Sequence, residues 1–176
     1  MENILIVVDM QNDFVDGALG TKEAQGIVDR VAGKISGFEG RIFATLDTHG
    51  KDYLDTAEGR KLPVPHCIRD TEGWRLNEKV QQALTGKEYR IIEKPTFGSL
   101  ELAEELRRIQ EKEEIRVEMV GLCTDICVVS NALLLKANFP ETGIAVDASC
   151  CAGVTPDTHR AALETMRMCQ IDITGE

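Results

Sequence analysis

The sequence has no run of about eighteen apolar residues, the length that a helix needs to cross a bilayer. It begins Met1-Glu2-Asn3 and passes directly into an apolar strand pattern, without the basic stretch and apolar segment of a secretory leader. Positive charge is also scarce, since 20 Lys and Arg stand against 30 Asp and Glu, a formal net charge of -10. Such a chain repels polyanions and anionic surfaces, so we expect no nucleic-acid partner, no membrane partner and a cytoplasmic location.

Disulfide bonds are not expected, although six cysteines are present, at Cys67, Cys123, Cys127, Cys150, Cys151 and Cys169. Disulfide frameworks are typical of small exported domains, so a chain of 176 residues without an export signal favours reduced thiols. Cys150, Cys151 and Cys169 are expected to be small core residues. The same length fits a single domain over residues 1–176, which can bury a sizeable core.

Apolar runs rich in β-branched residues alternate with helical patterns along the chain. We expect strands at Ile4–Val8, Arg41–Leu46, Tyr89–Ile92, Val117–Val120, Gly143–Val146 and Gln170–Ile173. Helices are expected at residues 22–38, 75–85, 100–111, 125–138 and 156–168. The helix at 125–138 is apolar on nearly every side, which predicts burial all round. The alternation predicts an α/β fold, a parallel sheet with helices on both faces.

In such sheets, ligands bind beyond the carboxyl ends of the strands, near the point where the strand order reverses. Asp9, Asp47, Lys94 and the segment Gly121–Cys127 occupy predicted strand ends. The longest irregular stretch runs from His49 to Trp74, and a loop of that length in a compact domain is more often functional than idle. These segments are therefore the places to look for a site.

Cys127 lies at the start of a predicted helix, where peptide N–H groups and the helix dipole favour a thiolate. The same N–H groups can stabilise the oxyanion of an attacked carbonyl. Asp9 could take the thiol proton and deliver it to a leaving amine, and Lys94 could stabilise the thiolate. Each residue also has a plain structural interpretation: a turn cap for Asp9, a solvated loop residue for Lys94 and an inert buried thiol for Cys127. Their joint placement at strand ends favours nucleophilic catalysis.

A second group consists of Asp47-Thr48-His49, Glu58 and His66-Cys67. Histidine with carboxylates suits a borderline divalent metal such as Zn²⁺, Fe²⁺ or Mn²⁺, and Cys67 is a further candidate ligand. By spacing alone the histidines could equally be surface residues, but the chain has only three, and two fall in this loop. The third, His159, lies near a helix start at Pro156 and is interpreted as structural.

Four segments together resemble the motifs of the isochorismatase-like cysteine hydrolases, in the same order along nearly the entire chain. They are Asp9-Met10-Gln11-Asn12-Asp13-Phe14, Lys94 with Phe97, Gly121 to Cys127-Val128, and Asp147-Ala148. The resemblance implies a three-layer Rossmann-like fold with a six-stranded parallel sheet and a catalytic triad of Asp9, Lys94 and Cys127. It also implies a cis peptide before Cys123, with the backbone N–H groups of Cys123 and Cys127 forming the oxyanion hole.

Within that family, Asp47, His49 and His66 resemble the metal ligands of the nicotinamidase/pyrazinamidase branch, and Glu58 resembles a fourth ligand found in some members. The resemblance implies a divalent metal, zinc first with iron or manganese as alternatives, that binds the pyridine nitrogen of the substrate. Two segments depart from the pattern. Asp70-Thr71-Glu72-Gly73 begins with Asp instead of Gly, and Leu62-Pro63-Val64 lacks the aromatic that some members place before the last metal histidine.

Phe14 and Trp74 are the candidates to line the substrate pocket in place of that aromatic. The resulting prediction is an amidohydrolase that converts nicotinamide, or a close heteroaromatic amide, to the acid and ammonia through a Cys127 thioester, as in NAD salvage. One alternative is a metal-independent hydrolase of the same family that acts on another small amide or ureide, such as an N-carbamoyl compound. Another is a redox-sensing protein that pairs Cys127 with Cys123 or Cys150. The resemblance also implies a homo-oligomer.

Overall fold

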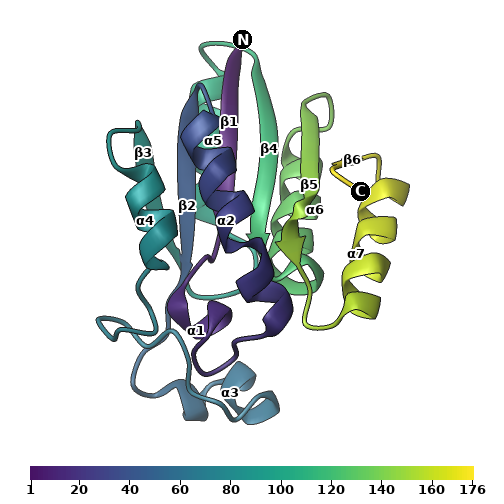
Figure 1. Cartoon of the computed structure of the whole chain (residues 1–176). Coiled ribbons are helices and arrows are strands. Elements are labelled where there is room, and N and C mark those ends of the chain that lie inside the picture. Colours follow the sequence, from purple (N-terminus) through teal and green to yellow (C-terminus); the bar gives the residue numbers. More distant parts are fainter.

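Six parallel strands form one sheet in the order β3-β2-β1-β4-β5-β6 (Figure 1). The computed structural model describes all of residues 1–176. The strands are β1 (Glu2–Val8), β2 (Arg41–Asp47), β3 (Tyr89–Lys94), β4 (Ile115–Leu122), β5 (Gly143–Ala152) and β6 (Asp172–Thr174). The chain starts in the middle of the sheet, builds outward to β3, and then returns to add β4 beside β1. The strand order therefore reverses between β1 and β4.

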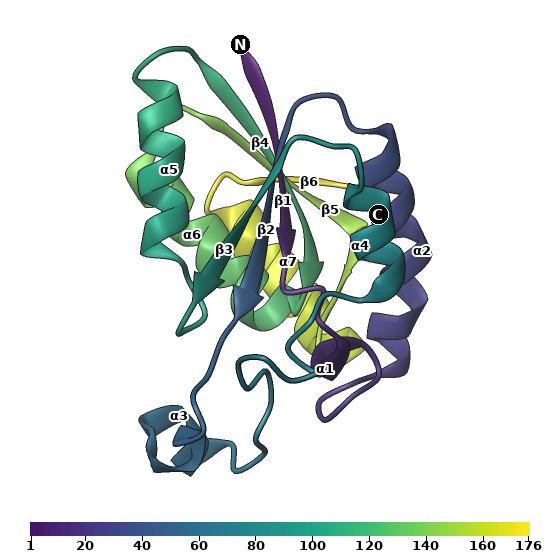
Figure 2. The same cartoon turned by 90° about the vertical axis from the view of Figure 1, so that its left-hand side faces the viewer.

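Helices cover both faces of this sheet (Figure 2). One face carries α2 (Lys22–Gly37) and α4 (Glu78–Leu84), and the other carries α5 (Leu100–Gln110), α6 (Val129–Asn138) and α7 (Pro156–Met168). Four short elements lie in the connections: α1 (Asn12–Val15), a 3₁₀ turn η1 (Tyr53–Asp55), α3 (Ala57–Lys61) and a π-helical turn η2 (Thr124–Val128). The predicted three-layer α/β fold is confirmed. No helix combines the length and the apolar character that a membrane span requires.

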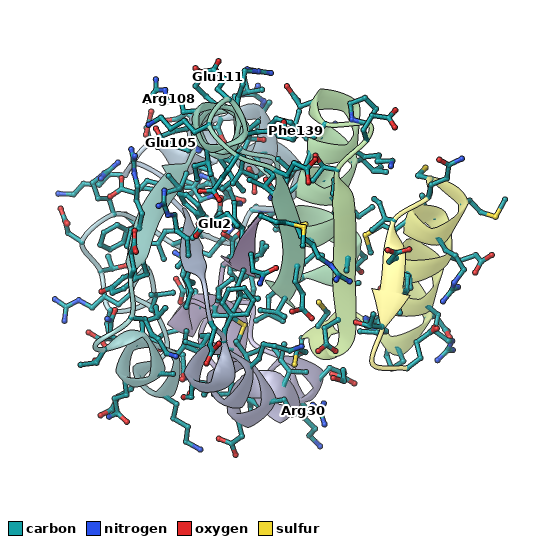
Figure 3. The ribbon with its side chains drawn as sticks, turned by 90° about the horizontal axis from the view of Figure 1, so that it is seen from above. Glu2, Arg30, Glu105, Arg108, Glu111 and Phe139 are labelled. Atoms are coloured by element: carbon teal, nitrogen blue, oxygen red, sulfur yellow. The ribbon has the colours of Figure 1, made fainter.

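Two apolar cores lie on either side of the sheet, one of 23 and one of 19 buried residues. In β1, Ile4, Ile6 and Val8 enter the larger core, while Leu5 and Val7 enter the smaller one. This division follows from the two-residue period of a strand, and it explains why the sequence of β1 is apolar without interruption. Figure 3 shows the molecule from above the view of Figure 1. Arg108 projects outward from α5, and Phe139, which follows α6, lies inward.

Three predictions about local structure need correction. The helix α6 is not buried all round, because Leu133 and Leu134 are half-buried and Ala137 is exposed. It belongs to an outer layer, so the sheet and the neighbouring helices cover only part of its circumference. Cys169 is exposed, unlike Cys150 and Cys151, because it follows the end of α7 at the surface. The long loop after β2 is also more ordered than expected, since it contains η1 and α3.

Gly121 permits the close approach of β4 to β1 next to the site. Its φ is +119°, and a Cβ at this position would lie 2.1 Å from the carbonyl oxygen of Val8. We expect Gly121→Ala to lower the free energy of unfolding by about 2 kcal/mol or more, because the added atom both clashes and strains the backbone. Urea unfolding followed by circular dichroism measures this change.

Gly26 provides the matched control, because it is exposed within α2 and a Cβ there would meet no atom within 4 Å. Gly26→Ala should stabilise the protein by roughly 0.5–1 kcal/mol, the cost of glycine in a helix interior. An unfolding free energy of Gly121→Ala equal to that of the wild type would contradict the packing argument.

Candidate active site and metal centre

The candidate residues meet where the parallel strands end. Asp9 follows β1, Asp47 ends β2, Lys94 ends β3, and Cys127 lies in η2 directly after β4. The register pairs Asp47 with Lys94, which brings the ends of β2 and β3 to the same level. The strand order reverses between β1 and β4, and in an open α/β sheet this is the place where ligands bind.

Lys94 is the centre of the first group. Its Nζ lies 2.6 Å from Asp9 Oδ2 and donates to Cys127 Sγ at 3.4 Å and to the Thr96 carbonyl at 3.1 Å. The side chains of Asp9 and Lys94 are completely shielded from solvent. A charge in such an environment is tolerated only when it is paired and hydrogen-bonded, which these contacts provide.

Asp9 is held at the end of β1 by Thr45 of the neighbouring strand. The Thr45 hydroxyl donates to Asp9 Oδ1 at 2.6 Å, and the backbone N–H of Asp9 points to the Thr45 Oγ1 and carbonyl oxygen, each at 3.2 Å. Asp9 has a φ of +45°, a left-handed conformation that Asp tolerates better than most residues. Thr45 is absent from the predicted site. The available signal was a polar residue inside the apolar run of β2.

The surroundings raise the pKa of all three groups, Asp9, Lys94 and Cys127, for different reasons. Burial raises the pKa of Asp9 more than the adjacent Lys94 lowers it. Burial alone would lower the pKa of Lys94, but Asp9 and the other negative groups outweigh it and raise this pKa, so the ammonium stays charged. Burial raises the pKa of the Cys127 thiol well above its usual value, and Asp9 raises it further, against the opposing effect of Lys94.

The helix start favours a thiolate, but the surroundings of the sulfur act in the opposite direction. Cys127 is only 4% exposed, and this burial favours the neutral thiol. A thiol that reacts must pass its proton to a base. The peptide bond between Leu122 and Cys123 is cis, as the resemblance implies.

The second group brings together Asp47, His49, Glu58 and His66, with one ligand atom of each lying within 4.8 Å of the others. Asp47 Oδ2 is 2.9 Å from His49 Nε2 and 3.4 Å from His66 Nε2. Glu58 Oε1 is 3.8 Å from each of these nitrogens. Donors bound 2.0–2.2 Å from a tetrahedral metal lie about 3.3–3.6 Å apart, so this donor set fits a divalent ion such as zinc.

The protonation of the candidate ligands Asp47 and His66 also favours the binding of a cation. Burial alone would raise the pKa of Asp47, but hydrogen bonds with His49 and His66 and the charge of Lys94 hold it below its usual range. His66 Nδ1 donates to the Val64 carbonyl at 2.8 Å, which leaves Nε2 as the ligand atom facing the group. Cys67 is buried nearby but is not part of the cluster.

Gln11, directly before α1, and Asp13, within α1, position this metal group. Gln11 is fully buried, and its amide donates to the carbonyls of Asp47 and Trp74, both at 2.8 Å, while its oxygen accepts the Asp47 N–H at 2.7 Å. Asp13 accepts the backbone N–H of Cys67, the neighbour of His66, at 2.8 Å. Both roles were missed in the sequence, although both residues belong to the segment that starts at Asp9.

A cavity of about 640 Å³ is lined by His49 and Glu58 of the second group and by Pro95 and Ile126, the chain neighbours of Lys94 and Cys127. Its lining consists of His49, Thr56, Ala57, Glu58, Lys61, Leu62, Pro95, Thr96, Phe97 and Ile126. Phe14 does not line it, but its ring lies 5.5 Å from that of His66. Trp74 lies away from it, where Nε1 donates to Thr48 Oγ1 at 2.8 Å and the ring borders a separate groove. The apolar wall of the cavity is instead formed by Leu62, Phe97 and Ile126.

Comparison with known proteins shows one consistent family. Residues 3–176 match the Isochorismatase domain. A nicotinamidase/pyrazinamidase of Mycobacterium tuberculosis (strain ATCC 25618 / H37Rv) is 29% identical over 183 residues, which cover 96% of this chain and 96% of that protein.

Solved structures show the same similarity. A nicotinamidase/pyrazinamidase of Bacillus subtilis superposes with a TM-score of 0.85 at 24% identity, over 99% of this chain and 100% of that one, and shows the fold. A pyrazinamidase of Pyrococcus horikoshii, solved in complex with zinc, has a TM-score of 0.82 at 27% identity, with 100% of both chains covered.

Replacing Gln11 should weaken metal binding without removing a ligand. In Gln11→Ala, the backbone of Asp47 loses both of its side-chain hydrogen bonds, so we expect zinc affinity to fall by about 10–100-fold, as is typical when a supporting contact of a metal ligand is lost. Competition with a chromophoric chelator measures the affinity directly. Gln82→Ala, on the exposed side of α4, is the control and should bind zinc like the wild type. Equal affinities for both variants would contradict the assigned role.

Proposed function

Because the chain belongs to the isochorismatase family, we propose that it is a cysteine amidohydrolase that converts nicotinamide, or a close heteroaromatic amide, to the acid and ammonia. The observation that carries this proposal is the placement of Lys94 against both Asp9 and Cys127, beside a cluster of two histidines and two carboxylates. One cavity borders the metal group and the turn that carries the thiol. The likeness to nicotinamidases supports the choice of substrate.

Asp9 carries the proton in each chemical step. Its raised pKa suits a group that takes the proton from Cys127 as the sulfur attacks the amide carbon. The oxygen of the tetrahedral intermediate then faces the backbone N–H groups of Cys123 and Cys127. Asp9 passes the proton to the amide nitrogen, ammonia leaves, and a thioester to Cys127 remains. Water attacks the thioester, with Asp9 accepting its proton, and the acid departs as the thiol is restored.

Lys94 does not exchange its proton in this sequence. Its raised pKa keeps it charged, and it donates to Sγ of Cys127 while paired with Asp9. The developing thiolate is therefore stabilised by a cation that is already in place, without reorganisation of solvent. This accounts for a reactive sulfur whose resting pKa is high.

Asp47, His49, Glu58 and His66 would hold a divalent ion, with zinc as our first choice and iron or manganese as alternatives. When bound, such an ion supplies a Lewis-acid contact for the ring nitrogen of a heteroaromatic amide. The residues that line the cavity orient the ring between this cluster and Cys127. Phe97, Ile126 and Leu62 provide the apolar surface against which the ring lies.

The two alternative functions receive less support. A metal-independent hydrolase of N-carbamoyl compounds has no use for four assembled ligands. A redox sensor needs an accessible thiol of low pKa, whereas Cys127 is buried and burial raises the pKa of Cys123 to about 12. A single domain over residues 1–176, a cytoplasmic location, a homo-oligomer and a place in NAD salvage stay predictions.

Ammonia release from nicotinamide tests the proposal. The wild type should release ammonia, and Cys127→Ala should lower the rate by about 10³-fold or more, because no other group can form the thioester. Chelation and His49→Ala should each abolish most of the activity, with recovery of the chelated wild type on addition of zinc. Cys169→Ala, an exposed cysteine far from the cavity, should retain full activity.

Two outcomes would overturn the assignment. Ammonia release that persists in Cys127→Ala would exclude the thioester route. Hydrolysis of N-carbamoyl compounds that continues after chelation, with nicotinamide untouched, would favour the metal-independent alternative.

The pH dependence should show an acid limb set by Asp9. Since Asp9 must be deprotonated to accept the thiol proton, activity is present above its pKa and is lost as the pH falls through it. That pKa is raised, so the midpoint of the limb in kcat/KM should lie above about 4, the usual value for a carboxyl group. A pH series of kcat/KM for nicotinamide measures it. A midpoint at or below about 4 would contradict the burial argument.

A further inference from the structure

The turn that carries Cys127 is tied to α7 by a contact that the proposed chemistry does not use. Thr124, the first residue of η2, is completely buried, and its Oγ1 lies 2.7 Å from Nδ1 of His159. His159 is half-buried on the first turn of α7, and burial lowers its pKa, which favours the neutral imidazole. With a neutral ring, either the Thr124 hydroxyl donates to Nδ1 of His159 or Nδ1–H donates to the hydroxyl oxygen, so the two atoms form one hydrogen bond.

The position of His159 is itself well defined. The first turn of α7 has a capping box, in which the Thr155 and Thr158 side chains each bond the backbone N–H of the other residue. Gly153 packs directly against this turn, since a Cβ there would lie 2.8 Å from the backbone nitrogen of His159. The imidazole is therefore presented to Thr124 from a rigid support.

A second tie joins the same two segments. The carboxylate of Asp125 accepts the backbone N–H of Val154, with its two oxygens at 3.2 and 3.1 Å. Thr124 thus anchors η2 to the first turn of α7, and Asp125 anchors it to the segment between β5 and α7. These two residues lie between Cys123 and Cys127, whose N–H groups face the oxyanion in the proposed mechanism.

We propose that His159 is a positioning residue, which acts through Thr124 to hold the turn from Cys123 to Cys127 in the geometry that stabilises the tetrahedral intermediate. The inference rests on the proposed amidase function. Loss of the contact affects the transition state more than substrate binding, because the oxyanion exists only after attack. It should lower kcat and leave KM nearly unchanged.

The test compares removal of the hydrogen bond with its conservative replacement. His159→Leu and Thr124→Val should each lower kcat by about 10–100-fold, less than or comparable to the loss of an oxyanion donor itself. His159→Asn and Thr124→Ser retain a group that can share the hydrogen and should stay within about threefold of the wild type. The double variant Thr124→Val with His159→Leu should be no slower than the worse single one, because both remove the same contact.

Two further measurements separate positioning from a general structural effect. Alkylation of Cys127 by iodoacetamide should proceed at the wild-type rate in all variants, since the thiol, Asp9 and Lys94 are untouched. Binding of pyridine-3-carbaldehyde, whose thiohemiacetal places an oxygen at the oxyanion position, should weaken in the same proportion as kcat. Thr165→Val, which removes an exposed hydroxyl from the same helix, is the matched control and should leave both unchanged.

The results distinguish the possible failures. The positioning role would be overturned if the alkylation rate of Cys127 fell in proportion to kcat. It would also be overturned if kcat of the double variant fell by the product of the two single-variant factors. Unchanged kcat in His159→Leu and Thr124→Val would also overturn it. If the wild type hydrolyses no amide, the proposed function fails first, and aldehyde binding by the same variants still reports whether the contact shapes the turn.

Discussion

The ion pair between Lys94 and Asp9 is the interaction on which the candidate site depends. Lys94 ends β3 and Asp9 follows β1, and β2 lies between these strands, so the lysine side chain must reach across the end of β2. Its ammonium is completely shielded from solvent and lies 2.6 Å from Asp9 Oδ2 and 3.8 Å from Asp47 Oδ1. Removing a charge from water costs several kcal/mol unless partners replace the lost solvation. The ends of three strands must therefore stay aligned for this arrangement to be stable.

The same lysine explains why two nearby carboxylates differ. Asp47 is surrounded by hydrogen-bond partners from His49 and His66 as well as the charge of Lys94, and its pKa lies below its usual range. Asp9 has Lys94 and one hydroxyl, that of Thr45, in a fully buried position, and its pKa is raised. One carboxylate is thus suited to remain anionic beside a cation, and the other to accept and release a proton. The division of labour follows from the surroundings, not from the residue type.

Reactive groups at the strand ends are held by residues from distant parts of the chain. Gln11 fixes Asp47, Asp13 fixes the residue beside His66, and Thr45 fixes Asp9. On the other side of the cavity, His159 and Asp125 connect the nucleophile turn to the β5–α7 junction. The fold therefore gives these segments a defined geometry, because each of them is hydrogen-bonded to residues that a strand or helix holds in place.

Much of this arrangement was accessible from the sequence, because strand and helix periodicity are local properties. Alternating apolar runs determined the α/β class, and polar residues at the ends of those runs marked Asp9, Asp47, Lys94 and Cys127. Tertiary structure alone decided the rest. The contacts of Gln11, Thr45 and Thr124 join residues 36, 36 and 35 positions apart, and no spacing rule encodes them. The burial of Cys127, the solvent exposure of one side of α6, and the position of Trp74 outside the cavity depend on how the layers pack, which a linear pattern does not contain.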